Sequence, residues 1–553
     1  MDKNYFDVIC IGGGGAGVLA AATAAEMGQK VALVTKEPPG YGNTRLAVGM
    51  IACPGVSQGD STAEFLGDII RSSEGLSDPH LVEALVENIP SALSLLEEKG
   101  LIIERDTEGC VSSVHQAGGH SQPRTLRNLG GGAGLGTVLR SIAYSHHVIV
   151  FNHTAVLEIL KEGSSVSGAV VMDLNTGELQ ALTARAVILA TGGCASLYYP
   201  HTTNARGAVG DGLSLGLKAG ASLVDMEQVQ SIPFGVTHPN SMLGALCGEP
   251  FTAGPAGVLM NGDGEVILEG DINRMTRAAL VKTMMMEISR GRTNPQGGLY
   301  LDLSPNLELP RGKELYRAME ATGIFQAVYF AYGEKAYRWE DPWSVLPSMH
   351  YLMGGLRVDA RGETGVPGLF AAGEIQGGVH GGNRLGSAAL SEIFAFGYLA
   401  GREASVYCRK REKPAGEGIE KAISGWKKFL AGEGENEPAS LRRELQECMW
   451  EKAGAVRQED KLLQALRQLE DISSRSRSLA LSGDRLCSRQ LLDAVELYHM
   501  FPAAEAIIKS SLLRRESRGA HLRLDCPEQD KNLQHHITVF LSHSGSVEAQ
   551  LEK

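Results

Sequence analysis

Apolar and turn-forming positions follow a regular order near the start of the chain. Residues 7–11 form a short apolar run, a glycine cluster follows, a stretch of alanines continues as a helix, and residues 31–35 are again apolar. Strand, glycine turn, helix and strand in this order predict a βαβ unit. Because Gly12, Gly14 and Gly17 give the G-x-G-x-x-G spacing, we expect the first turn to place a pyrophosphate at the helix N-terminus.

Two later apolar runs look like further strands of the same nucleotide-binding domain. Residues 186–193 read AVILATGG and residues 368–378 read GLFAAGEIQGG. Asp211 lies between two glycines where a helix begins, which favours a contact with a ribityl or ribose hydroxyl over a simple N-cap. Glu374 could accept hydrogen bonds from ribose hydroxyls. The nucleotide-binding domain is therefore expected to be split along the chain.

The end of the second strand and the spacing of the cysteines argue against an NAD cofactor and against a metal or iron–sulfur site. Thr35-Lys36 stands where an NAD-binding unit carries an acidic residue for the ribose, which argues against a simple NAD enzyme. The nine cysteines are single, without a C-x-x-C pair, so we expect no iron–sulfur cluster and no metal site in this chain. They are expected to be the reduced cysteines of a cytoplasmic protein.

Length, charge and the C-terminal pattern give the outline of the molecule. A chain of 553 residues suits two or three domains, and its net charge of −12 argues against a nucleic-acid partner. We find no signal-peptide pattern and no apolar run long enough for an integral membrane segment. Residues 419–434 and 458–481 carry apolar positions at three- and four-residue spacing, which predicts a helical bundle on which an electron-transfer partner could dock.

A series of motifs in fixed order extends over nearly the whole chain. The motifs are Gly12–Gly17, Thr35-Lys36, GGHSQPRT at 118–125, ATGG at 190–193, GDG at 210–212, HYLMGG at 350–355, AAGE at 371–374, HGGNRLGS at 380–387 and RRESRGAHLRLDCPEQD at 514–530. In this order they resemble the flavoprotein subunit of the succinate dehydrogenase and fumarate reductase family, which includes L-aspartate oxidase.

The resemblance implies an α/β fold with three domains. A Rossmann-like FAD-binding domain is expected in two parts, residues 1–236 and 349–405, with an inserted α+β capping domain at 237–348 and a C-terminal helical domain at 406–553. The resemblance also implies an iron–sulfur or ferredoxin-like electron-transfer partner. The residues expected to contact FAD are Gly12, Gly14, Gly15, Ala16, Gly17, Thr35, Lys36, Asn43, Thr44, Gly49, Ala190, Thr191, Gly192, Asp211, Gly373, Glu374, Arg384, Ser387 and Leu390.

The loop at 380–387 combines backbone freedom with a fixed cation. In the family, the matching loop touches the flavin with its backbone and its arginine binds a substrate carboxylate. Arg384 offers a planar fork that matches a carboxylate, and His350 is expected beside it as a second donor. His380 is a further candidate for substrate binding. The alternatives are a buried ion pair for Arg384 and a core histidine for His350.

Several positions depart from the family pattern. Asn43 stands where members with covalent flavin have a histidine, and an amide cannot form that bond, so FAD is expected to be non-covalent. A carboxylate-binding histidine is replaced by Ile232, and the best alignment puts Ile272 at the proton-donating arginine. His238 is a candidate replacement for the lost histidine, although a solvent-facing loop histidine fits it equally well.

The proton donor is left open among three nearby residues. Arg274 and Arg277 lie close to position 272, but a shift of two residues along a helix rotates a side chain by roughly 200°, so their arrival at the site cannot be assumed. Glu249 matches the family's proton-relay glutamate if one residue is inserted.

The substrate expected from these departures is an organic acid other than fumarate. One end of the site keeps His350 and Arg384 and the other is expected to be apolar, which suits a monocarboxylate with a hydrophobic body because an unpaired buried carboxylate is costly. Two alternatives stand beside this hypothesis. One is a true fumarate, succinate or L-aspartate enzyme with a shifted catalytic arginine, and the other is a flavin-binding protein without turnover.

Overall fold

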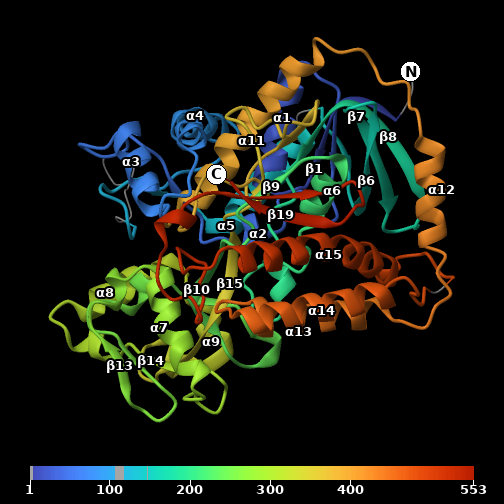
Figure 1. Cartoon of the computed structure of the whole chain (residues 1–553). Helices are drawn as coiled ribbons and strands as arrows, with labels where there is room; N and C mark the ends of the chain where they lie inside the picture. Colours follow the sequence, from blue (N-terminus) through green and yellow to red (C-terminus); the bar gives the residue numbers. More distant parts are fainter. Residues whose placement is uncertain (1–3, 106–116, 146, 482, 553) are drawn as a thin grey trace.

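The computed structural model describes residues 4–105, 117–145, 147–481 and 483–552. A seven-stranded sheet forms the centre of the largest domain, here called the large-sheet domain (Figure 1). Its strands are β5 (Ile149–Phe151), β2 (Val31–Val34), β1 (Tyr5–Ile11), β8 (Leu179–Leu189), β7 (Ser165–Asp173) and β6 (Thr154–Glu162) in this order, with β17 (Leu369–Ala371) paired to β8. β1, β2, β5, β8 and β17 pair in parallel, and β6 and β7 extend the sheet antiparallel.

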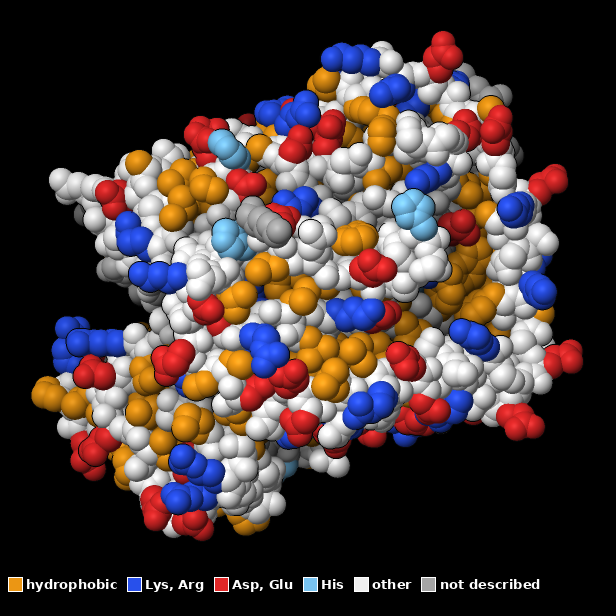
Figure 2. Space-filling view, viewed as in Figure 1, with side chains coloured by type: hydrophobic (Ala, Val, Ile, Leu, Met, Phe, Trp, Pro, Cys, Tyr) orange, Lys and Arg blue, Asp and Glu red, His pale blue; other side chains and the backbone are white. Residues whose placement is uncertain are grey.

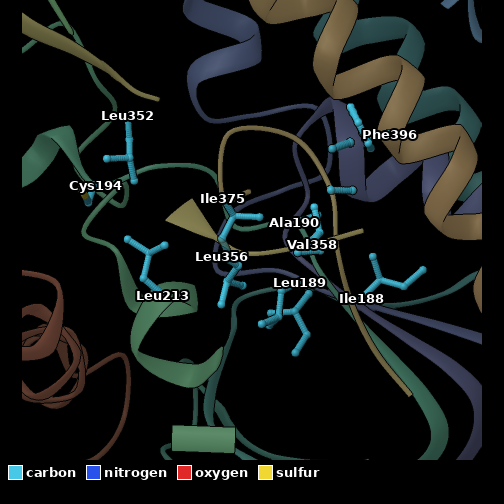
Figure 3. Packing of buried hydrophobic residues seen from close by; sticks show 14 of the residues in the cluster. Ile188, Leu189, Ala190, Cys194, Leu213, Leu352, Leu356, Val358, Ile375 and Phe396 are labelled. Carbon is cyan, nitrogen blue, oxygen red and sulfur yellow. The ribbon is translucent and has the colours of Figure 1, made fainter. Parts of the chain in front are cut away.

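Small residues let two long helices of this domain approach closely. α1 (Gly15–Glu26) packs against α11 (Ala388–Cys408). A Cβ added to Gly397 would lie 2.6 Å from the carbonyl oxygen of Ala16, and one added to Gly401 would lie 2.4 Å from that of Ala20. Larger residues at these positions would therefore force the two helices apart. Buried side chains from the sheet and its covering helices form one continuous core, part of which is drawn in Figure 3.

The remaining elements of the large-sheet domain are short or lie at its edges. The helices are α2 (Asn43–Leu46), α3 (Thr62–Ser72), α4 (Pro79–Glu98), α5 (Gly131–Ser145) and α6 (Asp211–Ala219), and the strands β3 (Met50–Ala52) and β4 (Thr125–Arg127) form a separate pair. The βαβ unit expected at the N-terminus is present as β1, α1 and β2, with Val8 opposite Val31 in the parallel register.

A second sheet with its own core forms the cap. Its strands run β11 (Leu246–Gly248), β10 (Val229–Val236), β15 (Trp343–Leu352), β14 (Leu299–Asp302), β12 (Val258–Met260) and β13 (Val266–Glu269), and its helices are α7 (Arg277–Ser289), α8 (Gly312–Thr322), α9 (Gln326–Tyr332) and α10 (Glu334–Tyr337). Phe325, Trp339 and Trp343 are fully or almost fully buried in this core. Because β10 and β15 pair along their lengths, the cap sheet includes residues on both sides of the limits predicted at 236/237 and 348/349.

The C-terminal region is mostly helical but ends in a hairpin. Its helices are α12 (Ile419–Phe429), α13 (Pro438–Ala453), α14 (Glu459–Arg475) and α15 (Arg489–Leu513). α12 packs on β6, β7 and β8, whereas α15 contacts α6. The hairpin of β18 (Ile537–Leu541) and β19 (Val547–Leu551) joins β9 (Leu223–Val224) and β16 (Gly355–Leu356) in a four-stranded sheet, so the end of the chain is built into the large-sheet domain.

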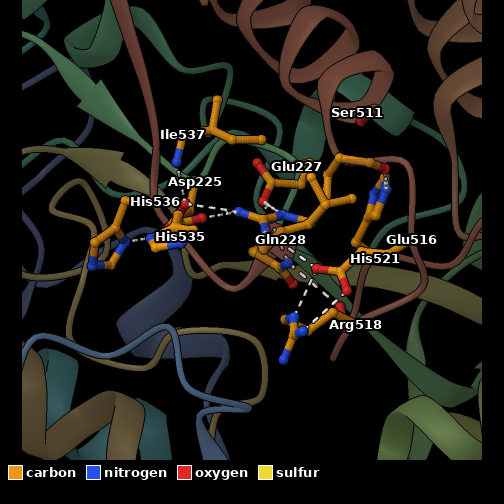
Figure 4. Close-up of polar contacts among 12 residues, drawn as sticks. Asp225, Glu227, Gln228, Ser511, Glu516, Arg518, His521, His535, His536 and Ile537 are labelled. Atoms are coloured by element: carbon orange, nitrogen blue, oxygen red, sulfur yellow. Dashed lines mark hydrogen bonds and ion pairs between the residues drawn. The ribbon is translucent and has the colours of Figure 1, made fainter. Parts of the chain in front are cut away.

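A buried network of charges fastens the segment after α15 to the start of the cap. The guanidinium of Arg514 lies 2.5 Å from Glu227, 3.3 Å from Asp225 and 3.4 Å from Glu516, and it also donates to the carbonyl oxygens of Leu533 and His535. Figure 4 labels the three carboxylates of this network. All three carboxylates are almost fully buried. Burial of this many charges is tolerated because each has a partner.

Surface charge, helix composition and side-chain grouping test the expectations about nucleic acid, membrane and metal. Acidic and basic side chains are interspersed over the face shown in Figure 2, which has no continuous basic stripe of the kind that binds nucleic acid. None of the helices in the described residues combines the length and apolar composition of a bilayer-spanning segment. In the same part of the chain, no three His, Cys, Asp or Glu side chains are grouped as metal ligands, and the cysteines are free.

Candidate active site

A cavity of about 640 Å³ is lined by most of the residues singled out from the sequence. It is lined by the first glycine turn, the ends of β2, β8 and β17, the loop at 380–387 and the near side of the cap. All residues expected to contact FAD line it except Gly17 and Gly373. A Cβ on Gly17 would lie 1.9 Å from the carbonyl oxygen of Gly12, so this glycine permits close packing inside the turn and does not itself line the cavity. Gly373 has φ +79° and packs against Ala16.

The glycine turn has the features of a site for a pyrophosphate. Gly14, Gly15 and Ala16 line the cavity where α1 begins, and the first turn of α1 contains no acidic residue. Helix N-termini of this kind bind anions through free backbone N–H groups. Gly192 also lines the cavity, with φ +79°, and no atom of the described residues lies within 4 Å of a Cβ added there, which leaves open space at this position. The buried hydroxyl of Thr191 has no partner among the described residues.

Lys36 and Asp211 both line the cavity but are bonded to each other. The Lys36 ammonium lies 2.9 Å from Asp211 and 2.8 Å from Glu496 of α15. Burial disfavours the charged form of Lys36, but the two carboxylates more than offset this and raise its pKa. Burial also acts on Glu496, where the charges of Lys36 and Arg442 prevail and lower the pKa to about 2. This ion cluster joins the C-terminal bundle to the cavity wall.

Asn43 connects the cavity to the segment that follows β8. Its Nδ2 donates to Oδ1 of Asn204 at 2.7 Å, and its Oδ1 accepts from the backbone N–H of Ala205 at 2.8 Å. Nδ2 of Asn204 in turn donates to the carbonyl oxygen of His350 at 2.6 Å. The Thr44 hydroxyl accepts from the backbone N–H of Gly15 at 3.1 Å. Both side chains therefore order the wall in addition to lining it.

Arg384 is a buried cation without an acidic partner. Its side chain is 4% exposed, and no carboxylate of the described residues lies within 4 Å of the guanidinium. Nη1 donates to the carbonyl oxygen of Leu385 at 3.1 Å, whereas the buried Nε has no partner in the described part of the chain. Burial, followed by the charge of Arg277, lowers the pKa of Arg384 to about 10. The side chain remains charged at neutral pH and is free to bind an anion.

The loop that carries Arg384 is supported from the end of the chain. The backbone N–H of Ala520 donates to the carbonyl oxygen of Gly382 at 2.8 Å. A Cβ on Gly519, which has φ +58°, would lie 2.0 Å from the same oxygen, so a glycine is needed for this approach. Nε2 of Gln230 donates to the carbonyl oxygen of Arg384 at 3.2 Å. The position of the loop thus depends on residues far away in the sequence.

His350 lies on the cavity wall as a neutral ring. Its Nδ1 is 2.7 Å from the hydroxyl of Thr203. Burial lowers the pKa of His350 to about 3, with the charge of Arg384 acting in the same direction. In the tautomer in which Nδ1 accepts from the Thr203 hydroxyl, Nε2–H is a donor toward the cavity. Thr203, which no sequence motif marks, also lines the cavity and fixes this ring.

Glu249 and Arg277 form a forked ion pair on the cap side of the same cavity. Nε and Nη2 of Arg277 each donate to a Glu249 oxygen at 2.8 Å, and Nη1 donates to the carbonyl oxygen of Arg384 at 3.1 Å. Burial alone would raise the pKa of Glu249, but Arg277, helped by Arg384, more than offsets it and keeps the pKa below its usual range. The first residue of α7 therefore reaches the site, which the sequence left open.

Two isoleucines expected at the apolar end of the site point elsewhere. Ile232 on β10 and Ile272 in the short 3₁₀ turn η4 (Ile272–Arg274) are fully buried and do not line the cavity. β10 changes register between Ile232 and Gly235, which alters the direction of the side chains along it. The cap wall is instead mixed: its apolar residues are Leu246, Pro250, Phe251, Met275 and Ile324, and its polar residues are Glu249, Asn273, Arg274, Thr276 and Arg277.

The structure places three further candidates at the edge of the cavity or outside it. Arg274 lines the cavity, but its side chain is 80% exposed and lies 3.4 Å from Asp271. His238 does not line the cavity; the centroid of its ring lies 4.7 Å from that of Tyr332 with the planes tilted by 36°, and its Nδ1 is 3.1 Å from the Thr237 hydroxyl. His380 is buried beside Glu392, also outside the cavity. Neither histidine is positioned to contact a substrate there.

Comparison with known proteins agrees with this arrangement. The family model for the FAD binding domain matches residues 7–390, and that for the fumarate reductase flavoprotein C-terminus matches residues 442–553. The chain is 34% identical over 538 residues to one subunit of the fumarate reductase (CoM/CoB) of Methanothermobacter marburgensis, covering 94% of each chain. It is 30% identical to the fumarate reductase flavoprotein subunit of Escherichia coli, covering 99% of this chain and 93% of that protein.

Solved structures show the same fold over the full length. A chain of quinol-fumarate reductase with menaquinol molecules superposes with a TM-score of 0.89 at 28% identity, covering all of this chain and 98% of that chain. The Rossmann-like domain, the cap and the C-terminal helical domain expected from the sequence are thereby confirmed. The chain belongs to the family of succinate dehydrogenase and fumarate reductase flavoproteins and is an FAD-dependent oxidoreductase.

Proposed function

We propose that this enzyme transfers a hydride between non-covalently bound FAD and the double bond of a small organic acid other than fumarate. It exchanges electrons with a separate iron–sulfur or ferredoxin-like carrier protein. The observation that carries the proposal is the buried guanidinium of Arg384, which has no carboxylate partner among the described residues and faces the cavity. A buried cation in this state is stabilised by an anionic ligand.

The residues present fit FAD. The N-terminus of α1 suits its pyrophosphate, Glu374 suits a ribose hydroxyl, and Gly192 leaves room for the cofactor. When bound, FAD supplies the hydride. Asn43 provides no nucleophile for a covalent bond. Acid precipitation should therefore release all the flavin as FAD, and flavin retained on the denatured chain would refute this assignment.

The count of charges around the cavity favours a single carboxylate. Arg384 is charged and unpaired, Arg277 is neutralised by Glu249, and His350 is neutral. The exposed Arg274 is paired with Asp271. One buried, unpaired positive charge thus remains, and a second carboxylate would find no further unpaired cation among these residues, which makes its burial costly.

The chain's own residues divide the work of the reaction. Arg384 and Nε2–H of His350 bind and orient the carboxylate. The apolar side chains of the cap wall, among them Phe251, Met275 and Ile324, surround the hydrocarbon part and exclude water. Arg277, held in a fixed direction by both oxygens of Glu249, is the candidate that delivers the proton to the carbon next to the one that receives the hydride.

A second candidate function is a true fumarate reductase or succinate dehydrogenase. The observation that favours it is the presence of Arg277 on the cavity wall, since a shifted arginine is what such an enzyme needs here. The names of the relatives point to the same substrate, and their being subunits supports a separate electron carrier. A flavin-binding protein without turnover is disfavoured by the unpaired Arg384.

A substrate comparison separates the candidates. With reduced dye as donor, purified FAD-loaded protein is assayed on fumarate and on unsaturated monocarboxylates of similar length. We expect negligible turnover of fumarate and measurable turnover of at least one monocarboxylate. Reduction of fumarate at tens per second would establish the second candidate instead. Failure of every substrate to oxidise the reduced flavin would leave the protein without this activity.

A further inference from the structure

His380 opens the loop at 380–387, yet its ring belongs to a separate buried cluster. It is 2% exposed, and its Nε2 lies 3.1 Å from Oε2 of Glu392 on α11. The Tyr351 hydroxyl donates to the same oxygen of Glu392, and Nε2 of Gln376 donates to the other at 3.4 Å. Glu392 is 1% exposed. No basic side chain except His380 lies within 4 Å of its carboxylate in the described chain.

Tyr351 joins this cluster to the substrate site. The face of its ring lies 4.6 Å from the guanidinium carbon of Arg384, and its hydroxyl points at Glu392. Tyr351 directly follows His350 on β15, so the backbone of this strand positions both side chains. Burial raises the pKa of Tyr351 well above its usual value, and the charge of Glu392 raises it further. The phenol therefore stays protonated and continues to donate.

The ring is the main surface against which Arg384 can be oriented. The guanidinium makes one hydrogen bond to the described chain, from Nη1 to the carbonyl oxygen of Leu385, and its Nε is unpartnered. A single bond leaves the plane of a guanidinium free to rotate, whereas stacking on an aromatic face fixes the plane. A phenol bonded to a carboxylate cannot turn, and its ring is also richer in electrons and attracts a cation more strongly.

We propose that Glu392, Tyr351 and His380 form a positioning cluster for the substrate carboxylate, in which Glu392 fixes the phenol and the phenol fixes the plane of the Arg384 guanidinium. The role of the cluster rests on the proposed function in one respect, namely that Arg384 binds a carboxylate. His380 and Glu392 do not line the cavity, whereas Tyr351 does. His380 and Glu392 therefore act on the substrate through the direction in which the fork of Arg384 opens.

The test compares variants that remove one link at a time in the FAD-loaded full chain. Tyr351→Phe keeps the ring but loses the bond to Glu392, Glu392→Gln removes the charge, and Tyr351→Leu removes the ring. The probes are acrylate, crotonate and 2-hexenoate, whose dissociation constants are measured from the perturbed absorbance of oxidised flavin. For the tightest probe we expect an increase of about 3–10-fold for Tyr351→Phe and Glu392→Gln, and of about 5–30-fold for Tyr351→Leu.

The matched control is Tyr332→Phe in the cap. Tyr332 also donates from a partly buried phenol, to the carbonyl oxygen of Ser344 at 2.5 Å, but it does not line the cavity. The Tyr332→Phe variant should bind each probe with the same dissociation constant as the wild type, even if the melting temperature of the variant is lower. For the positioning variants that turn over, KM should rise while kcat stays within about twofold, as expected when an interaction common to ground and transition states is weakened.

Arg384→Ala distinguishes a failure of carboxylate binding by Arg384 from a failure of the positioning cluster. If this variant binds every probe as well as the wild type does, or if the wild type binds none, the proposed function fails. If Arg384→Ala weakens binding but Tyr351→Phe, Tyr351→Leu and Glu392→Gln do not, the positioning cluster is refuted. Crystal structures of the variants give an answer that needs no ligand: the guanidinium plane should rotate in Tyr351→Leu and Glu392→Gln, and an unchanged plane in both would overturn the proposal.

Discussion

Two buried arginines in this molecule have opposite surroundings. Arg514 is fully buried among the carboxylates of Asp225, Glu227 and Glu516 and two backbone carbonyls. Arg384 is 4% exposed and has no carboxylate within 4 Å in the described chain. Burial lowers the pKa of both, but at Arg514 the charge of Glu227 prevails and the pKa is raised, whereas at Arg384 it is lowered to about 10.

The difference shows what each arginine is for. A cation whose partners are all within the chain closes a network and joins segments, as Arg514 does between the start of the cap and the C-terminal loop. A cation buried without them is unfavourable until an anion arrives. Burial alone therefore does not distinguish a structural arginine from a binding arginine; the presence or absence of internal carboxylates does.

The largest expected effect is on kcat and concerns Arg277. This arginine is paired with a carboxylate, as Arg514 is, but lines the cavity, as Arg384 does. Arg277→Gln should lower kcat by about 10²–10⁴-fold, since a positioned general acid contributes that much. Steady-state rates with the best substrate check this. Arg274→Gln is the control, because its side chain is 80% exposed and should matter little. A loss in Arg274→Gln with none in Arg277→Gln would assign proton delivery to Arg274 instead.

The next effect tests the structural arginine by stability. Arg514→Met leaves the buried Glu227 without its cation, whereas Glu516 keeps Arg518 and Asp225 keeps His536, and it should cost about 3–5 kcal/mol. Arg384→Met removes an uncompensated charge and should leave stability unchanged or raise it. Thermal unfolding of the FAD-loaded variants compares the two. A larger loss for Arg384→Met than for Arg514→Met would contradict the distinction drawn between them.

A smaller effect is expected on activity when Arg384 itself is changed. Arg384→Ala should raise KM and lower kcat together, with kcat/KM reduced about 10–150-fold, the value of a hydrogen-bonded charge. Arg384→Lys should restore little, because an ammonium lacks the forked geometry. Full activity in the lysine variant would show that charge alone is required and that the plane of the guanidinium is irrelevant.

The smallest expected effect is on the pH dependence of stability and involves Glu374, a buried carboxyl group that lines the same cavity as Arg384. Burial raises its pKa to about 7. A carboxyl group whose pKa is raised on folding contributes stability below its unfolded pKa and loses it as the pH rises through the folded pKa. The apoprotein should thus lose stability between pH 5 and 8, and Glu374→Gln should flatten that decline by a few degrees of Tm. Identical pH profiles in the two apoproteins would show that Glu374 ionises normally.

The sequence predicted the parts of the site that depend on backbone pattern. The glycine turn, Thr191 and Gly192, and the loop with Arg384 all line the cavity as expected. Their positions follow from local strand–turn–helix order, which is visible in a single sequence.

Side-chain directions at bulges and short turns could not be predicted in this way. Ile232 follows a register shift in β10, and Ile272 lies in η4, so neither reaches the place its alignment suggested. Arg277 reaches the cavity as the first residue of α7. His380 stands in the expected motif but faces Glu392, a partner that only the packing of α11 brings to it. Pairings between distant segments leave no periodic signal in the sequence.

The contact between Ala520 and Gly382 bears on the order in which the protein is made. The glycine turn, the cap and Arg384 leave the ribosome long before residues 519 and 520, which support the loop at 380–387. A nascent chain that has released every residue of the cavity still lacks this support. The residues that line the FAD cavity can therefore bind the cofactor during synthesis. The carboxylate site is completed only after the C-terminal segment has folded back onto the loop at 380–387.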